Sequence, residues 1–208
     1  MLSQEPLMSL LNVSNKIQVY PYYFKQQMPG AYDGCYVRGG VVKKLIEVAN
    51  ELPEGYSLVI LDGWRSIETQ RALYEMTKQK FRSSFHDETK LLSFVSKFVA
   101  LPSKEPPSPH YTGGAVDLTI ANQQGWLNMG TEFDAFTDKA GALYFEQKED
   151  LTGEELEIRE NRRLLRNAME GVGFTIHPNE WWHFDYGNLR WASATNKSPI
   201  YKGIELNI

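Results

Sequence analysis

The chain has 208 residues, of which 42% are hydrophobic and 23% are charged. These values are ordinary for globular proteins and exclude a disordered chain, so we expect one domain that spans residues 1–208. The 22 basic and 26 acidic side chains give a formal net charge of -4. No run of Lys or Arg is present that could follow a phosphate backbone, which argues against nucleic acid as a partner.

The single cysteine, Cys35, excludes an intrachain disulfide and a cysteine-based structural zinc site. Any metal must therefore be held by nitrogen and oxygen ligands. The N-terminal segment MLSQEPLMSLLNVSNKIQVYPYY lacks the basic start and continuous apolar stretch of a signal peptide. No segment approaches the roughly 20 apolar residues that span a bilayer. We expect a cytoplasmic location, or a periplasmic one if a signal peptide has been removed, and no membrane partner.

The first part of the chain predicts extended structure, then a helix and a strand. Residues 1–38 are rich in Tyr, Pro and Gly and predict extended segments and turns. Apolar residues at helical spacing predict a helix over 41–52. The run YSLVIL at 56–61 is typical of a buried strand. Arg65 is therefore expected just past a strand end.

Two helices and a proline-rich loop follow. Ser66 and Asp87 are preferred N-cap residues, and they predict helices that run to about residues 81 and 101. A helix cannot continue through LPSKEPPSPH, because its four prolines lack backbone donors and fix φ. We expect this segment to cross the surface as a loop that ends at His110.

The next elements are a strand and a charged helix. The glycine pair at 113–114 permits a tight turn, and AVDLTI at 115–120 alternates as a strand does, with Asp117 inside it. The Thr-x-x-Glu spacing at 152–155 is that of a capping box and predicts a helix that ends near Gly171.

The C-terminal part predicts two short paired strands. Residues 174–176 and 182–186 flank the HPNE turn and are expected to pair with each other. The tail after Trp191 is expected to be a loop. The chain has no internal repeats or low-complexity tracts, which agrees with a single domain.

Two of the four histidines lie in informative surroundings. In SPHYTGGAVD, Pro109 and the glycines break strand regularity, so a folded-back loop can direct both His110 and Asp117 inward. In EWWH, the three-residue offset between Glu180 and His183 places both on one side of a turn or helix, but not of a flat strand. The sequence leaves this local geometry open.

These residues form a ligand set that is typical of catalytic zinc. Two imidazoles and one carboxylate leave a fourth position for water, so we expect one Zn²⁺ per chain on His110, Asp117 and His183. Zinc lowers the pKa of its bound water to about 7, and Glu180 is the candidate to take the proton as water attacks a carbonyl carbon. Arg65 is placed to stabilise the negative charge on the carbonyl oxygen.

The motifs SPHYTGGAVD and EWWH resemble those of the zinc D-alanyl-D-alanine peptidases. DGWR at 62–65 and MGTEFDAF at 129–136 are more similar to the D-alanyl-D-alanine dipeptidases of the vancomycin-resistance type, over about residues 18–190. The resemblance implies an α+β fold, with a mostly antiparallel sheet flanked by helices and a zinc site in a capped central cleft. It also implies zinc-dependent hydrolysis of the D-alanyl-D-alanine dipeptide to D-alanine.

The resemblance also assigns roles to single residues. It implies the same three zinc ligands, makes Glu180 the general base and acid, and gives Arg65 the role of polarising the substrate carbonyl. Ser108 and Asp134 are substrate contacts, with Asp134 facing the free amino group of a dipeptide. Ser66 departs from the family pattern, which often has proline after DGxR.

Several alternatives remain open. His86 and His177 lack acidic or histidine neighbours at useful spacing and are predicted to be exposed or turn residues without a role. A non-haem iron oxygenase also uses two histidines and a carboxylate but does not need Glu180, and a metal-binding module needs neither Glu180 nor Arg65. Among peptidases, the alternative is a zinc D,D-carboxypeptidase acting on peptidoglycan stem peptides. That enzyme requires an open groove and export, so the absent signal peptide favours the dipeptidase.

Overall fold

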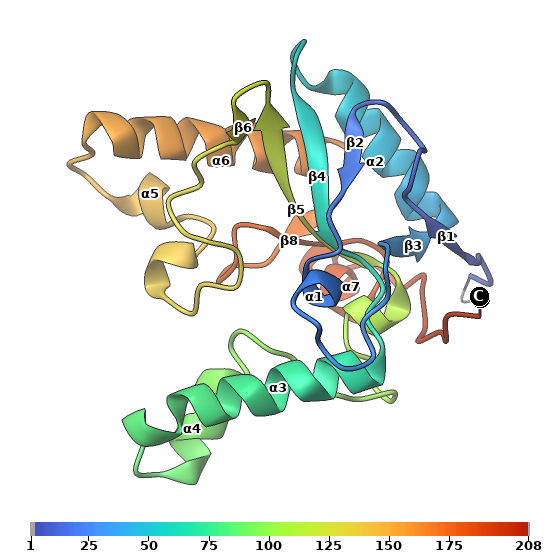
Figure 1. Ribbon diagram of the computed structural model, residues 1–208, viewed down its shortest axis with the longest axis vertical. Coiled ribbons are helices and arrows are strands. Elements are labelled where there is room, and N and C mark those ends of the chain that lie inside the picture. Colours follow the sequence, from blue (N-terminus) through green and yellow to red (C-terminus); the bar gives the residue numbers. More distant parts are fainter. Residues whose placement is uncertain (1–2, 208) are drawn as a thin grey trace.

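The computed structural model describes residues 3–207, which form a six-stranded sheet, a separate two-stranded sheet and surrounding helices (Figure 1). The large sheet has the order β2-β4-β5-β8-β7, and β6 pairs with β5. Only β2 and β4 run parallel; the other pairs are antiparallel. The strands are β1 (Leu7–Ser9), β2 (Ile17–Val19), β3 (Tyr36–Arg38), β4 (Ser57–Asp62), β5 (Ala115–Asn122), β6 (Gly125–Trp126), β7 (Thr175–Ile176) and β8 (His183–Asp185).

The helices are arranged around this sheet and confirm the predicted α+β class. In Figure 1, α2 and α6 lie behind the sheet, whereas α3 and α4 form an arm below it. The α-helices are α1 (Tyr22–Lys25), α2 (Gly39–Glu51), α3 (Ile67–Phe81), α4 (Glu88–Val95), α5 (Tyr144–Gln147), α6 (Gly153–Gly171) and α7 (Leu189–Thr195). Within residues 3–207, none of these helices is both long and apolar enough to cross a membrane.

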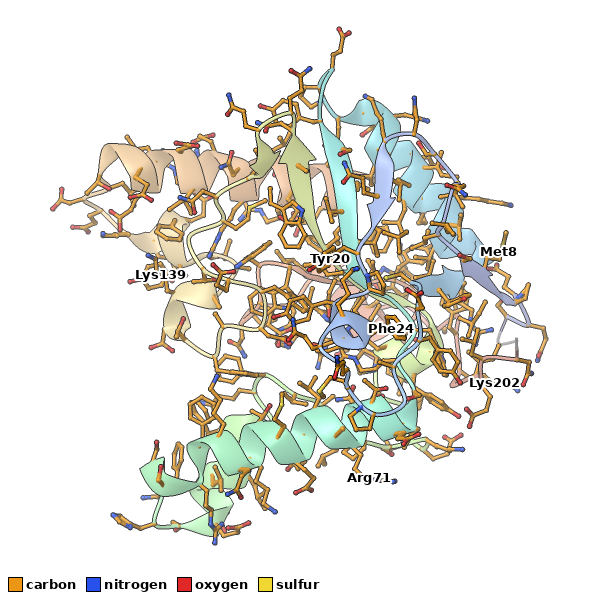
Figure 2. The ribbon with its side chains drawn as sticks, viewed as in Figure 1. Met8, Tyr20, Phe24, Arg71, Lys139 and Lys202 are labelled. Atoms are coloured by element: carbon orange, nitrogen blue, oxygen red, sulfur yellow. The ribbon has the colours of Figure 1, made fainter. Side chains whose placement is uncertain are left out.

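The core lies between the sheet and the helices that cover it. Val116, Leu118 and Ile120 alternate along β5 and are fully buried, so they occupy one face of this strand. They belong to the same hydrophobic cluster as apolar residues of α2 and α6. Side chains fill the space between sheet and helices, whereas Met8 and Phe24 are exposed (Figure 2). The opposite face of β5 carries polar side chains, among them the carboxylate of Asp117.

The helix starts follow the predicted caps. Ser66 accepts a hydrogen bond from the backbone N–H of Thr69, and α3 ends at Phe81 as expected. At α6, Thr152 and Glu155 form a reciprocal capping box. These side chains satisfy backbone donors that the first turn of a helix leaves unpaired, which is why the local sequence marks the start so well.

Two predicted boundaries are wrong. Asp87 caps α4 as expected, but the helix ends at Val95 and not near residue 101. Beyond Val95 the chain closes into turns that place Phe98 against Phe136 and bury Val99. The tail after Trp191 is helical as far as the end of α7, because Asn188 caps this short helix.

Candidate active site

A row of polar residues crosses three neighbouring strands of the large sheet. Asp62 of β4 pairs with Asp117 of β5, and Asp117 pairs with His183 of β8. Residues that are directly opposite in neighbouring strands place their side chains on the same face. His110 reaches this face from a 3₁₀ turn at the end of the proline-rich loop. Gly113 then reverses the chain with φ of 70°, which confirms the expected folded-back loop.

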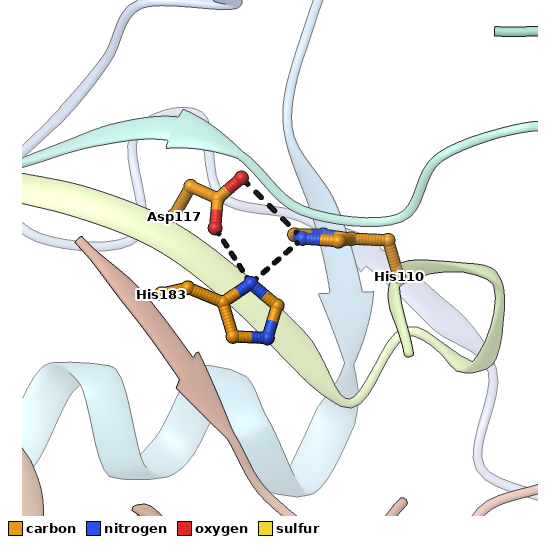
Figure 3. Close-up of side chains that lie close together, drawn as sticks. All are labelled: His110, Asp117 and His183. Atoms are coloured by element: carbon orange, nitrogen blue, oxygen red, sulfur yellow. Dashed lines mark hydrogen bonds and ion pairs between the residues drawn. The ribbon is translucent and has the colours of Figure 1, made fainter. Parts of the chain in front are cut away.

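His110, Asp117 and His183 meet in a buried cluster (Figure 3). His110 Nε2 lies 3.1 Å from His183 Nδ1 and 3.3 Å from Asp117 Oδ2. His183 Nδ1 lies 2.9 Å from Asp117 Oδ1. A tetrahedral zinc ion at its usual bond lengths separates its ligand atoms by roughly 3.4 Å. The cluster therefore fits zinc in both its donor atoms and its size.

Each imidazole is held by a partner on the nitrogen that faces away from the cluster. His110 Nδ1 lies 2.7 Å from the carbonyl oxygen of Gly63, and His183 Nε2 lies 3.1 Å from Asp185 Oδ1. Both partners are acceptors, so these nitrogens carry the protons and donate them. The lone pairs of His110 Nε2 and His183 Nδ1 are then directed into the cluster, as metal coordination requires.

The charges in the cluster depend strongly on one another. Burial lowers the pKa of His183, but the carboxylates of Asp185 and Asp117 outweigh burial and raise this pKa to about 10. Burial likewise raises the pKa of Asp117, but His110 and His183 outweigh it and hold the pKa well below its usual range. Asp117 and His183 thus stabilise each other's charged forms. A metal ion that binds to both competes with protons.

Glu180 lies in the turn that precedes β8. Because Trp181 and Trp182 form a turn and not a strand, the three-residue offset brings Glu180 Oε2 to 3.8 Å from His183 Nδ1. Burial raises the pKa of Glu180 to about 8. A carboxyl group with such a pKa can exchange a proton near neutral pH, which is the requirement for a general base and acid.

Arg65 is fixed at the end of β4 by several partners. Its Nε donates to Asp62 Oδ2 at 2.8 Å, and its two terminal nitrogens donate to Gln70 Oε1 at 3.0 Å and to Asp117 Oδ2 at 3.2 Å. The guanidinium carbon also lies 4.6 Å from the centre of the Tyr23 ring. Burial lowers the pKa of Arg65, but the acidic groups around it, Tyr23 and Asp62 foremost, outweigh burial and raise it. Arg65 is a permanent, immobile cation beside the cluster.

The two predicted substrate contacts differ in their placement. Asp134 is half-buried, has a left-handed φ of 58° and accepts a hydrogen bond of 2.8 Å from the Tyr23 hydroxyl. Its removal from water raises its pKa to about 7. Ser108 is buried next to Pro109, and its hydroxyl has no hydrogen-bond partner within residues 3–207. Asp134 lines the pocket described next. Ser108 does not line it, although the following residue, Pro109, does.

A small pocket connects these residues. Its walls come from α1, the α3–α4 arm, the metal-ligand cluster and α7. The lining residues are Tyr23, Arg65, Gln70, Leu73, Phe98, Val99, Ala100, Pro109, His110, Asp117, Asp134, Glu180, Trp182, His183 and Arg190. The predicted ligands, base and arginine therefore share one pocket, to whose lining the arm contributes Gln70 and Leu73.

The structure places further residues at the site. The sequence predicts His177 to be an exposed or turn residue without a role, but its side chain is buried, with Nδ1 3.9 Å from Glu180 Oε2. Its three-residue spacing from Glu180 within a turn was the available signal. Asp185 follows His183 by two residues on a strand, a spacing that places both on one face. Tyr23 contacts Arg65 and Asp134 through tertiary packing, and no local pattern marks it.

Residues 35–198 match the D-ala-D-ala dipeptidase family of M15 peptidases. The chain belongs to this family. This assignment confirms the resemblance seen in the motifs and the predicted class of zinc metallopeptidase. The family's zinc chemistry also agrees with the buried cluster of two histidines and one aspartate.

Individual relatives are similar over different shares of their length. A D-alanyl-D-alanine dipeptidase from Synechocystis sp. is 29% identical over 93% of this chain and 86% of the relative. One from Enterococcus faecium is 27% identical over 63% of this chain and 62% of the relative. Among solved structures, the vancomycin resistance D,D-dipeptidase VanXYg in complex with a D-Ala-D-Ala phosphinate analog is 22% identical. The match covers 95% of this chain and 66% of the VanXYg chain, with a TM-score of 0.44.

Proposed function

We propose that this chain is a single-domain, zinc-dependent dipeptidase that hydrolyses D-alanyl-D-alanine to free D-alanine. The observation that carries the proposal is the buried cluster of two imidazoles and one carboxylate, with Glu180 beside it, in one pocket. Membership of the D-ala-D-ala dipeptidase family supports the substrate class. Relatives from Synechocystis sp. and Enterococcus faecium carry the name of this activity.

The metal would be held by His110, Asp117 and His183, one ion per chain. When bound, zinc acts as a Lewis acid and lowers the pKa of water to about 7. The hydrogen bonds to the Gly63 carbonyl and to Asp185 keep both imidazoles in the tautomer that can bind a metal. These contacts would orient both imidazoles for metal binding.

Glu180 is the group that moves protons. It takes a proton from the attacking water and delivers it to the nitrogen of the leaving amino acid. Burial raises the pKa of Glu180 to about 8, and a bound cation would lower it. Glu180 can therefore accept and release a proton within one catalytic cycle.

Arg65 and Asp134 bind charges at different places along the substrate. The Arg65 guanidinium, already fixed by Asp62 and Gln70, stabilises the negative charge that develops on the carbonyl oxygen. Asp134 pairs with the free ammonium group of the dipeptide. Ser108 does not line the pocket, and its contact with the substrate stays a prediction. Arg65 is buried, and interactions between charges are stronger at a buried site than in open water.

The test is an assay of the purified protein with D-alanyl-D-alanine, its L,L isomer and a muropeptide, each with and without added zinc. We expect D-alanine to be released from the free D,D-dipeptide alone, and only when zinc is present. Preferential cleavage of the muropeptide would replace the proposal with a D,D-carboxypeptidase. A zinc-loaded protein that cleaves none of the three would refute a peptidase of this specificity.

A further inference from the structure

Asp185 lies two residues after His183 on β8, so both side chains leave the strand on the same face. Asp185 is only 1% exposed, and its Oδ1 lies 3.1 Å from His183 Nε2. This contact is on the side of the imidazole opposite to Asp117 and His110. The Asp185 carboxylate therefore lies outside the metal-ligand cluster and contacts the outer nitrogen of His183.

Asp185 also contacts residues at the start of α7. Asn188 Nδ2 donates a hydrogen bond of 2.5 Å to Asp185 Oδ1. The Oδ1 of Asn188 accepts from the backbone N–H of Trp191 at 3.0 Å and so caps α7. Arg190, which lines the pocket, lies 3.9 Å from Asp185 Oδ2. The Asn188 side chain thus connects the start of α7 to the Asp185 carboxylate.

We infer that Asp185 is a positioning residue, which fixes His183 in the tautomer and orientation that a metal ion requires. The inference rests on the proposed zinc site. An ionised carboxylate has no proton to donate, so its hydrogen bond to His183 requires a proton on Nε2. Nδ1 is then left with the lone pair that points into the cluster. The negative charge also makes the imidazole a stronger ligand.

The alternative is that Asp185 only joins β8 to α7. Asp185→Asn separates the two roles, because asparagine keeps the shape of the side chain but loses the charge. Its amide can also rotate and donate a proton to Nε2, which would move the imidazole proton to Nδ1, the wrong nitrogen. The matched control is Asn188→Ser. Serine is a good N-cap and keeps α7 capped, but it removes the amide donor to Asp185.

The experiment measures zinc affinity by competition with a chelator in the wild type, Asp185→Asn and Asn188→Ser. We expect Asp185→Asn to bind zinc about 10- to 100-fold more weakly, which is the usual effect of losing a partner behind a metal ligand. Asn188→Ser should stay close to the wild-type affinity. With Co²⁺ in place of zinc, the visible absorption bands should shift in Asp185→Asn and not in the control. Thermal unfolding of the metal-free proteins checks that each variant is folded.

The inference is overturned if folded Asp185→Asn matches the wild type in zinc affinity and Co²⁺ spectrum. It is also overturned if Asn188→Ser loses as much affinity as Asp185→Asn, because the junction with α7 would then explain the effect. A wild-type protein that binds no zinc would overturn the proposed metal site itself. If Asp185→Asn does not fold, the long-range ¹⁵N–¹H NMR spectrum of the zinc-loaded wild type decides. His183 must be protonated at Nε2, and coordination through Nε2 would refute the inference.

Discussion

At the scale of single residues, the function of His110 and His183 depends on which nitrogen of each ring is occupied. Two acceptors, the Gly63 carbonyl and Asp185, occupy the outer nitrogens and leave the inner ones available. The purified protein should therefore contain about one zinc per chain, and His110→Ala or His183→Ala should remove it, because two remaining ligands rarely suffice. Elemental analysis checks this expectation. Stoichiometric zinc in both variants would refute the assigned ligands.

Glu180 differs from the ligands because metal binding does not require it. Glu180→Gln keeps the shape and hydrogen-bonding capacity of the side chain but cannot take a proton from water. We expect zinc content to be unchanged and kcat to fall by about 10²-fold or more, with a much smaller change in KM. Steady-state kinetics combined with metal analysis measure both. Near-normal turnover by a zinc-loaded Glu180→Gln protein would refute Glu180 as the general base.

Arg65 requires a more conservative change than truncation. Removing it leaves Asp62 and Asp117 as buried carboxylates without their cation, and such a loss is strongly destabilising. Arg65→Lys keeps the charge but loses the planar fork that binds several partners at once. We expect zinc to stay bound, the fold to persist and kcat to fall, because the cation no longer reaches the developing oxyanion correctly. Circular dichroism checks the fold, metal analysis checks the zinc content, and steady-state kinetics give kcat. An unchanged kcat in the folded, zinc-loaded Arg65→Lys protein would contradict this role of Arg65.

At the scale of secondary-structure elements, sequence patterns predict the long elements better than the short ones. The helices at 39–51, 67–81 and 153–171 have apolar periodicity or N-cap residues that act locally. The helix α7 has only 7 residues and depends on packing of Trp191 against Tyr186. Isolated helices of this length are unstable in water, so the information that forms them lies elsewhere in the chain.

Two helix caps allow stability to be separated from activity. Thr152→Ala removes the capping box of α6, which contributes no residue to the pocket. We expect a loss of about 1 kcal/mol in the free energy of unfolding, a fall in Tm of about 2–4 °C and unchanged kcat/KM.

The comparison variant is Ser66→Ala at the start of α3. The Ser66 hydroxyl caps the helix and also bonds the Gly30 carbonyl at 2.9 Å, directly after Arg65 in the chain. Ser66→Ala should therefore lose both stability and activity. Thermal unfolding and kinetics of the two variants test this. An equal loss of activity in Thr152→Ala would mean that the caps act on the site through global stability alone.

For the molecule as a whole, the pocket combines segments that are far apart in the sequence. Tyr23 comes from the N-terminal region, Phe98 from the end of the helical arm and Arg190 from the C-terminal helix. The grouping of His110, Asp117 and His183 could be predicted because their motifs have fixed spacing around a turn or strand. Contacts such as that between Tyr23 and Asp134 depend on tertiary packing across 111 positions of sequence. No local pattern contains that information.

The position of Asp134 in the lining of the pocket predicts selectivity for a free dipeptide. The carboxylate of Asp134 is half-buried and has the Tyr23 hydroxyl as its hydrogen-bond partner, so a substrate ammonium adds the missing cation. N-acetylation removes the positive charge of the substrate, so the Asp134 carboxylate has no ammonium group to pair with. Sites built to bind a polar group discriminate strongly against its loss. We expect kcat/KM for N-acetyl-D-alanyl-D-alanine to be lower than for the free dipeptide by at least about 10²-fold.

Asp134→Asn is the matched control for this selectivity. Asparagine tolerates the left-handed φ of 58° at this position, so the backbone is not strained as it would be with alanine. The variant loses the negative charge, and its kcat/KM should fall for the free dipeptide but change little for the acetylated one. The ratio between the two substrates should then approach one. If the wild type cleaves both substrates equally fast, Asp134 does not bind the ammonium group, and longer peptides become accessible substrates.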